Sequence, residues 1–154
     1  MLLNRQVYNY CLHMLCDRES AEDTTQEVFV QVLKDIKDLR SVEKFRAWLF
    51  QIARHQVLMT LRRRRIESHE ELNEGIWENE TPLEITSRVE AQEHIQQAIA
   101  QLKHEYREVL HLREFEQLSY AEIAFATGAT ESSVRSRLFK ARKALFQKLA
   151  PLSK

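Results

Sequence analysis

The sequence predicts an all-α protein of two small helical domains joined by a flexible acidic linker. Apolar residues recur at intervals of three and four along most of the 154-residue chain, which is the spacing of one helix face. The chain contains only two glycines and two prolines, so few residues break or bend a helix. No useful stretch alternates apolar and polar residues as a half-buried strand does. The predicted boundaries give residues 1–66, 67–81 and 82–154.

Several classes of protein are excluded by what the sequence lacks. No apolar run approaches the roughly 20 residues that span a bilayer, and the start carries no signal-peptide pattern, so we expect a cytoplasmic protein without membrane insertion. It has no glycine-rich phosphate loop, metal-ligand spacing or nucleophile motif, so we expect neither an enzyme nor a bound cofactor or metal. Cys11 and Cys16 flank His13, but no second ligand pair follows, which favours two reduced core thiols over a metal site.

Charge is distributed unevenly along a chain whose net charge is zero. Residues 1–65 carry 12 basic and 8 acidic side chains, and residues 130–154 carry 7 basic and 1 acidic. Residues 66–97 carry 1 basic and 9 acidic side chains. Two basic ends therefore flank an acidic middle, a pattern that permits nucleic-acid binding at both ends.

The first two predicted helices carry a polar patch. The first runs from Leu3 to near Asp17, and the second begins at Ser20, which has the spacing of a capping box. The second helix is expected to place Phe29, Leu33 and Ile36 on one face. Acids in a first turn also favour the helix dipole, so a structural role and a binding role stay open for the patch. It consists of Glu22, Asp23, Gln26 and Glu27.

A third helix, after a connection at residues 37–43, interleaves aromatic and basic side chains. Bases stack on aromatic rings and cations follow the backbone, so this pattern suits single-stranded DNA. Phe45 and Leu49 are expected in the core, whereas Trp48 could serve either role. The basic and ring side chains of the helix are Arg46, Arg54, His55 and Arg62 to Arg65.

Helical periodicity fades in the acidic segment 67–81 and resumes at Thr81-Pro82-Leu83-Glu84, which has the signature of a helix start. A long helix follows, and another is expected from about His104 to Phe115. We expect these two helices to supply the core for the last part of the chain.

The last part has the spacing of a helix-turn-helix. A short apolar-periodic run at residues 120–126 is followed by Gly128 and by a longer run from Thr130. Gly128 suits a turn that requires positive φ, and Ser119 and Thr130 suit the two N-caps. Ile123, Ala124, Val134, Leu138, Ala141 and Leu145 are expected to form the buried seam.

The outward face of the second helix of this motif is rich in polar and basic groups. A recognition helix contacts bases with its first turns, and its later cations contact phosphates. A solvated cationic face is the alternative, but a turn motif that orients the helix favours DNA binding. The predicted DNA-facing residues are Glu131, Ser132, Arg135, Ser136, Phe139, Lys140, Arg142 and Lys143.

The order of these motifs resembles the extracytoplasmic-function (ECF) subclass of bacterial sigma-70 factors, and the resemblance covers nearly the whole chain. Such proteins have two helical domains, one for core RNA polymerase and the promoter −10 element and one for the −35 element. Four segments carry the resemblance: SAEDTTQEVF (20–29), FRAWLFQIAR with LRRRR (45–54 and 61–65), YREVLHLREFEQLSYAEIA (106–124) and SVRSRLFKAR (133–142).

The resemblance implies a role for each predicted surface. The patch Glu22, Asp23, Gln26 and Glu27 is implied to dock on the clamp of the polymerase's largest subunit, and the flap is a further implied contact. The face from Glu131 to Lys143 named above is implied to read −35 duplex. An anti-sigma factor is a further implied partner. The implied −10 DNA-binding residues are Leu39, Arg40, Lys44, Arg46, Trp48, Arg54, His55, Met59 and Arg62.

An autonomous helix-turn-helix regulator is the alternative hypothesis. Such a protein binds duplex operator without polymerase, usually as a symmetric dimer. It would leave the arginine and aromatic content of residues 1–65 without a role, so the sigma factor is the favoured interpretation.

Overall fold

The computed structural model describes residues 2–68 and 88–150, and in these residues every regular element is a helix. The predicted all-α class is confirmed. Most of the predicted linker, with the helix start at residues 81–84, lies outside the described residues. The elements are α1 (Leu2–Leu15), α2 (Arg18–Asp35), η1 (Ile36–Asp38), η2 (Val42–Lys44), α3 (Phe45–Ser68), α4 (Arg88–Ala100), α5 (His104–Leu110), η3 (His111–Phe115), α6 (Tyr120–Thr127) and α7 (Glu131–Leu149).

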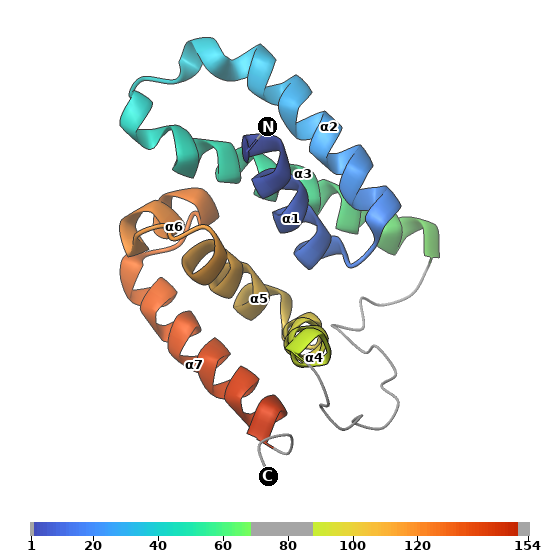
Figure 1. Cartoon of the computed structure of the whole chain (residues 1–154). Coiled ribbons are helices and arrows are strands. Elements are labelled where there is room, and N and C mark those ends of the chain that lie inside the picture. The colour runs from blue at the N-terminus through green and yellow to red at the C-terminus, as the bar shows by residue number, and fades with distance from the viewer. Residues whose placement is uncertain (1, 69–87, 151–154) are drawn as a thin grey trace.

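Helices α1, α2 and α3 pack on one another and form the upper group in Figure 1, coloured blue to green. Their core is apolar, with Val7, Val28 and Phe50 almost fully buried. Two buried threonines on α2 are satisfied locally: the Thr25 hydroxyl donates to the Ala21 carbonyl, and Thr24 shares a hydrogen bond with Thr60 of α3. Hydroxyls therefore sit inside this core without an unpaired polar atom.

The start of α2 differs from the prediction, because Asp17 and not Ser20 is its N-cap. An Asp17 carboxylate oxygen accepts hydrogen bonds from the Ser20 backbone amide at 3.1 Å and from the Ser20 hydroxyl at 2.6 Å. These bonds lower the pKa of Asp17, which is the expected effect of donors on a carboxylate. The capping residue therefore precedes the predicted one by three positions, and the helix begins earlier.

Of the three residues predicted for the apolar face of α2, Phe29 packs against the core, but the other two are exposed. Leu33 is 75% exposed and Ile36 is 47% exposed, whereas the buried stripe runs through Thr24, Val28 and Val32. The hydrophobic periodicity of the sequence did not reveal this stripe, because the buried Thr24 and Thr25 do not count as apolar residues in such a pattern. At the first helix, Leu3 is likewise exposed, although the rest of the predicted face from Val7 to Leu15 is buried.

Helices α5, α6 and α7 pack together with η3 and α4 in the lower group of Figure 1. The predicted single helix from His104 to Phe115 is α-helical to Leu110 and then becomes a π-helical turn. The predicted helix-turn-helix is confirmed as α6 and α7, with Gly128 at φ 71° between them. Ser119 forms a full capping box with Glu122 on α6.

The two groups of helices pack against each other. Helix α6 lies along the first turns of α3, and α1 contacts α4, α5 and η3. Figure 1 shows α1 and α3 facing α5 and α6 across this seam. No helix within residues 2–68 and 88–150 combines the length and hydropathy that a bilayer crossing needs. Cys11 is a buried free thiol, as predicted for the core, whereas Cys16 is only partly buried.

We expect the variant Gly128→Ala to lower the free energy of unfolding by about 1 to 2 kcal/mol, the usual cost of a β-carbon in the left-handed region. A β-carbon at this position meets no atom within 4 Å, so the cost is one of backbone conformation alone. Urea denaturation measures it. Gly128→Asn is the matched control and should cost less, because asparagine adopts this conformation more readily. Equal losses for both variants would contradict this explanation.

Candidate functional site

The predicted polymerase-binding patch lies on an accessible face of α2. Glu22, Asp23 and Gln26 are exposed and Glu27 is half-buried. Glu27 faces Arg63 of α3, with 3.6 Å between the carboxylate oxygen and the guanidinium nitrogen. A surface hollow of about 480 Å³ lies beside them and is lined by Asp23, Gln26, Glu27, Val30, Gln31, Lys34, Gln56 and Arg63.

Exposed apolar side chains continue this surface along α2. Val30 is 52% exposed and Leu33 is 75% exposed, one and two turns beyond Gln26. A polar rim beside exposed aliphatic groups has the composition of a protein-protein contact. Leu33, which the sequence placed on the apolar face of α2, therefore belongs to a surface and not to the core.

The residues predicted for −10 DNA divide into two sets on α3. Successive side chains on an α-helix are about 100° apart, so residues with suitable spacing share a stripe. His55 and Arg62 are exposed, Met59 is 40% exposed, and Trp48 is half-buried with its ring centroid 5.9 Å from that of Phe45. The stripe that the structure brings together consists of Trp48, His55, Met59 and Arg62.

Arg46 and Arg54 lie on a different side of α3 and face the C-terminal helices. Arg54 Nε donates to Glu108 Oε2 at 2.9 Å, and Arg46 Nη2 donates to the Glu116 carbonyl oxygen at 2.6 Å. Arg46 Nη2 also lies 3.6 Å from Glu116 Oε2. The structure therefore separates these two arginines from the exposed stripe of α3.

The connection between α2 and α3 carries the remaining predicted −10 residues. Arg40 and Lys44 are exposed and Leu39 is half-buried. The Leu39 amide donates to the Ile36 carbonyl at 3.2 Å, and the Lys44 amide to the Ser41 carbonyl at 3.2 Å. Two short helical turns thus hold a segment that the sequence presented as an irregular connection.

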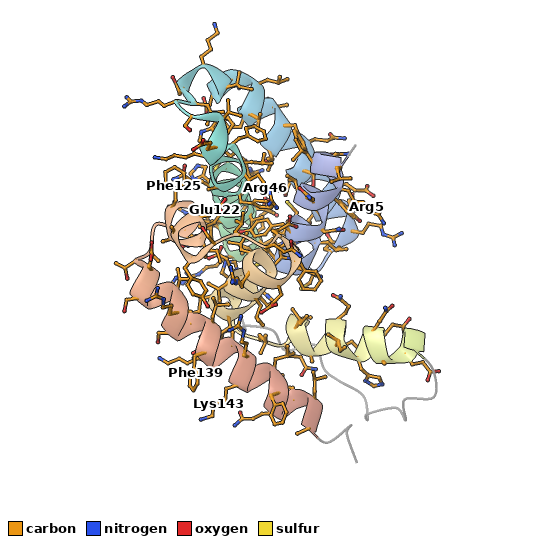
Figure 2. The ribbon with its side chains drawn as sticks, turned by 60° about the vertical axis from the view of Figure 1, so that its left-hand side comes forward. Arg5, Arg46, Glu122, Phe125, Phe139 and Lys143 are labelled. Atoms are coloured by element: carbon orange, nitrogen blue, oxygen red, sulfur yellow. The ribbon has the colours of Figure 1, made fainter. Side chains whose placement is uncertain are left out.

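The residues predicted to read −35 DNA form one continuous exposed face of α7. All eight of them, from Glu131 to Lys143, are exposed, while Val134, Leu138 and Ala141 on the opposite side are buried. Thr130 caps the helix by accepting the Ser133 amide at 3.1 Å. Figure 2 shows Phe139 and Lys143 on the outer side of α7, away from the N-terminal helices.

Two arginines of this face are held by neighbouring helices. Arg142 donates to Glu114 Oε1 from Nη2 at 2.8 Å and from Nε at 3.2 Å, and this pairing raises the pKa of Arg142. The Arg135 guanidinium lies over the Tyr120 ring at 5.4 Å from its centroid. Both contacts leave the arginines exposed, so they orient the side chains without covering them.

Sequence reasoning missed a chain of polar groups, some buried and some partly exposed, at the seam between the two groups of helices. His13 Nδ1 of α1 lies 2.6 Å from His111 Nδ1 of η3, and His111 Nε2 lies 3.1 Å from Glu116 Oε1. His13 Nε2 lies 2.8 Å from Gln96 Oε1 of α4. These hydrogen bonds join α4, α1 and η3 in series, and Arg46 of α3 completes the series by donating to the Glu116 carbonyl.

Burial shifts the pKa values of three groups at the seam: His13, His104 and Glu108. Burial, with the neighbouring His111, lowers the pKa of His13 from 6.5 to about 4. Burial, with Arg107 and Arg54 nearby, lowers the pKa of His104 to about 4. Burial raises the pKa of Glu108, an effect that the hydrogen bonds from Arg54 and Tyr10 oppose. The seam therefore favours the neutral forms of His13 and His104.

One signal in the sequence could have identified this seam. Glu108 is followed by Val109 and Leu110, and all three are buried on α5. An acid on such an apolar face requires a partner, because an unpaired buried carboxylate is costly. The pattern alone did not reveal that the partner is Arg54, which precedes Glu108 by 54 residues.

Comparison with known families assigns both groups of helices. Residues 2–66 match the family model for sigma-70 region 2, and residues 92–145 match the model for sigma-70 region 4. The chain therefore belongs to the sigma-70 family of RNA polymerase sigma factors.

Its relatives place it in the ECF group of that family. It is 35% identical over 148 residues to RNA polymerase sigma factor YlaC of Bacillus subtilis (strain 168), a match that covers 91% of this chain and 86% of that one. It is 34% identical over 147 residues to RNA polymerase sigma-H factor of Pseudomonas aeruginosa, covering 88% and 76%. ECF RNA polymerase sigma factor SigW of Bacillus subtilis is 27% identical over 158 residues, covering 96% and 84%.

A solved structure supports the fold. The sigma factor RpoE, crystallised in complex with the anti-sigma factor NepR from Bartonella quintana, matches with a TM-score of 0.79 and 21% identity. The match covers 97% of this chain and 92% of that one. The family models and the relatives confirm the sigma-factor interpretation over the autonomous regulator.

We expect the stability advantage of wild type over the variant His13→Gln to fall by about 2 kcal/mol between about pH 7 and about pH 5. The folded state lowers the pKa of His13 from 6.5 to about 4, so its stabilising effect is complete above 6.5 and lost as the pH falls toward 4. Titration of Glu108 changes stability with pH in the opposite direction. Because Glu108 is present in both proteins, its contribution cancels when the stability of the variant is subtracted from that of wild type. Urea denaturation at several pH values measures it.

The matched control is His55→Gln, which removes an exposed imidazole from α3. Comparison of the two variants separates the effect of the seam position from that of losing an imidazole anywhere in the chain. A His13→Gln difference that stays constant over that pH range would show that His13 titrates normally in the folded protein.

Proposed function

We propose that this ECF sigma factor confers promoter specificity on core RNA polymerase through three surfaces of its own and catalyses no reaction itself. The observation that carries the proposal is the exposed face of α7, which a capped turn presents at a fixed angle beside α6. Core polymerase would bring the two groups of helices into register on a promoter. We place its action in the cytoplasm, where polymerase and promoter DNA meet.

The face of α7 is proposed to read the −35 element as duplex. Arg135 lies in the second turn of the helix, where side chains reach base edges, and it is oriented by Tyr120. Lys140 and Lys143 follow on the exposed side and suit phosphate contacts. Phe139, which is 70% exposed, offers an apolar surface to a thymine methyl group.

Helix α3 and the connection before it are proposed to bind the −10 element as a separated strand. The stripe of Trp48, His55, Met59 and Arg62 offers aromatic rings to unstacked bases and a guanidinium to the backbone. Unstacking a base step costs a few kcal/mol, so a surface of this size requires polymerase to supply further contacts. Free protein should therefore bind promoter DNA weakly.

The patch on α2 is proposed to dock on the clamp of the polymerase's largest subunit. Support comes from its exposed acids beside exposed aliphatic groups, which together suit a basic and apolar partner surface. The flap is a second proposed contact, made by the C-terminal helices. RpoE was solved with an anti-sigma factor, and we extend that class of partner to this chain.

We expect Arg135→Ala to reduce discrimination at a single −35 position by about 1 to 3 kcal/mol, as loss of a bidentate base contact does. Transcription in vitro from a library of promoter sequences, with core RNA polymerase and this chain, measures it. Lys143→Ala is the matched control and should weaken initiation evenly on all sequences, as loss of a phosphate contact does. An even loss with Arg135→Ala would reduce this residue to a phosphate contact.

We expect Asp23→Arg to weaken binding to core RNA polymerase at least about tenfold, which is about 1.4 kcal/mol. The reversal places a cation where the proposal requires an acid against a basic clamp. Fluorescence anisotropy of the labelled chain with core polymerase measures it. The matched control is Glu93→Arg on α4, which makes the same charge change at another exposed position. Equal affinities for the two variants would contradict the assignment of the patch.

A further inference from the structure

Sulfur atoms differ widely in their access to solvent in this protein. Among the methionines and cysteines within residues 2–68 and 88–150, Met14 is 1% exposed, Cys11 is buried and Cys16 is partly buried. Met59 differs from them, because it is 40% exposed. A close-packed core shields a thioether from small oxidants, whereas a thioether at the surface is open to them.

The exposed thioether lies within the stripe of α3 that we propose to bind the −10 strand. Side chains three and four positions apart are neighbours on a helix, so Met59 is placed between His55 and Arg62 along this stripe. Val57, which lies on the opposite side of the helix, is fully buried and therefore fixes which side of α3 faces the solvent. The structure thus presents a sulfur atom in an accessible row with an imidazole and a guanidinium.

A methionine at this position suits contact with an unstacked base. Its side chain is unbranched, flexible and polarisable, and its sulfur makes favourable contacts with aromatic rings. It has no charge and only a weak acceptor, so it suits the face of a base and not a phosphate. Oxidation of the sulfur would therefore alter the part of the stripe that contacts bases and leave the guanidinium of Arg62 unchanged.

We propose that Met59 is an oxidation site, where hydrogen peroxide converts the thioether to a sulfoxide and thereby weakens binding of the −10 strand. This inference rests on the proposed function, since it takes the −10 role of α3 from there. The sulfur lone pair attacks one peroxide oxygen, the O–O bond breaks and an S–O bond forms. The released hydroxide takes the proton of the transferred oxygen and leaves as water. Sulfur loses two electrons and the peroxide gains them.

The sulfoxide presents a different surface to a base. It is polar and chiral where the thioether is apolar, and this change disrupts the contacts that methionine makes. Methionine sulfoxide reductases reverse the reaction, with thiols that are oxidised to a disulfide while the oxygen leaves as water. Because Met59 is exposed, such an enzyme has access to it. The modification is therefore reversible without degradation of the chain.

The test oxidises the full chain with hydrogen peroxide, removes the peroxide, adds dithiothreitol and only then adds core RNA polymerase. Dithiothreitol reduces sulfenates and disulfides of Cys11 and Cys16 but leaves a sulfoxide in place. Peptide mass spectrometry should find oxygen added to Met59 at least about tenfold faster than to Met14. Transcription from the promoter library should fall about threefold to tenfold, as expected for loss of a contact between sulfur and a ring.

Met59→Leu and Met14→Leu are the matched variants, because each replaces one thioether by an aliphatic side chain of similar volume. Each variant is compared with its own untreated sample, so a change in its basal activity does not enter the result. Met14→Leu should remain as sensitive to peroxide as wild type, whereas Met59→Leu should become insensitive. A loss of initiation that persists in Met59→Leu would overturn the proposal.

The variant Met59→Gln tests the same contact without an oxidant. Glutamine is unbranched and polar, as the sulfoxide is, so untreated Met59→Gln should initiate about threefold to tenfold less than untreated Met59→Leu. Equal initiation by these two variants would contradict the proposed effect of a polar group at this position.

Two further readouts locate the effect of oxidation. Binding of oxidised wild type to core polymerase, measured by fluorescence anisotropy, should change less than about twofold, because the patch on α2 contains no sulfur. The −35 preference obtained from the library should stay unchanged, because α7 contains no methionine or cysteine. A fall in polymerase binding as large as that in initiation, or a changed −35 preference, would place the effect elsewhere and overturn the proposal.

Repair of the oxidised protein provides the reverse experiment. Methionine sulfoxide reductase should restore initiation by oxidised wild type to the level of the untreated sample. Initiation that stays low after mass spectrometry shows Met59 to be reduced again would rule out its sulfoxide as the cause.

Untreated protein separates failure of this inference from failure of the proposed function. If the function is wrong, untreated wild type does not stimulate initiation by core RNA polymerase. If only the inference is wrong, untreated wild type stimulates initiation and the sample that carries Met59 sulfoxide does so equally.

Discussion

The arrangement of the two groups of helices depends on one buried carboxylate. Glu108 is 1% exposed, and a charge in that position is stable only with donors directed at it. Tyr10 and Arg54 provide them from two different helices. The position of α5 is therefore set by polar geometry as well as by apolar contact. The neighbouring contacts of His13, His111 and Glu116 extend the same constraint along the seam.

Polar contacts join the two groups of helices at their seam. An apolar interface exposes its surface to water when it opens, whereas carboxylates and guanidiniums regain hydration. Interfaces between domains of one chain are accordingly more polar than those of permanent assemblies. The apolar core within each group, such as Val28 and Phe50 above and Ile123 and Leu138 below, has no such reversibility. Separation at the seam thus costs less than unfolding of either group.

Local signals predicted most of the fold, the exposed patch on α2 and the outward face of α7. Gly128, Ser119 and Thr130 act on their immediate neighbours, so the helix-turn-helix and the outward face of α7 could be predicted residue by residue. The start of α2 was misplaced because Asp17 competes with Ser20 for the same role. Sequence periodicity could not pair Arg54 with Glu108, since a helical pattern shows which face is buried but not what covers it.

The same pairing chemistry has opposite consequences on the two helices that we propose to bind DNA. On α7, Arg142 and Glu114 are about half exposed, at 49% and 51%, and an ion pair in that setting contributes little because water and salt screen it. A phosphate can displace Glu114 without any movement of the backbone. On α3, Arg54 pairs with a carboxylate that water does not reach, so the pair is exchanged only when the helices part. Burial of the acidic partner, more than its charge, therefore decides which arginines are available to DNA while the two groups of helices are packed together.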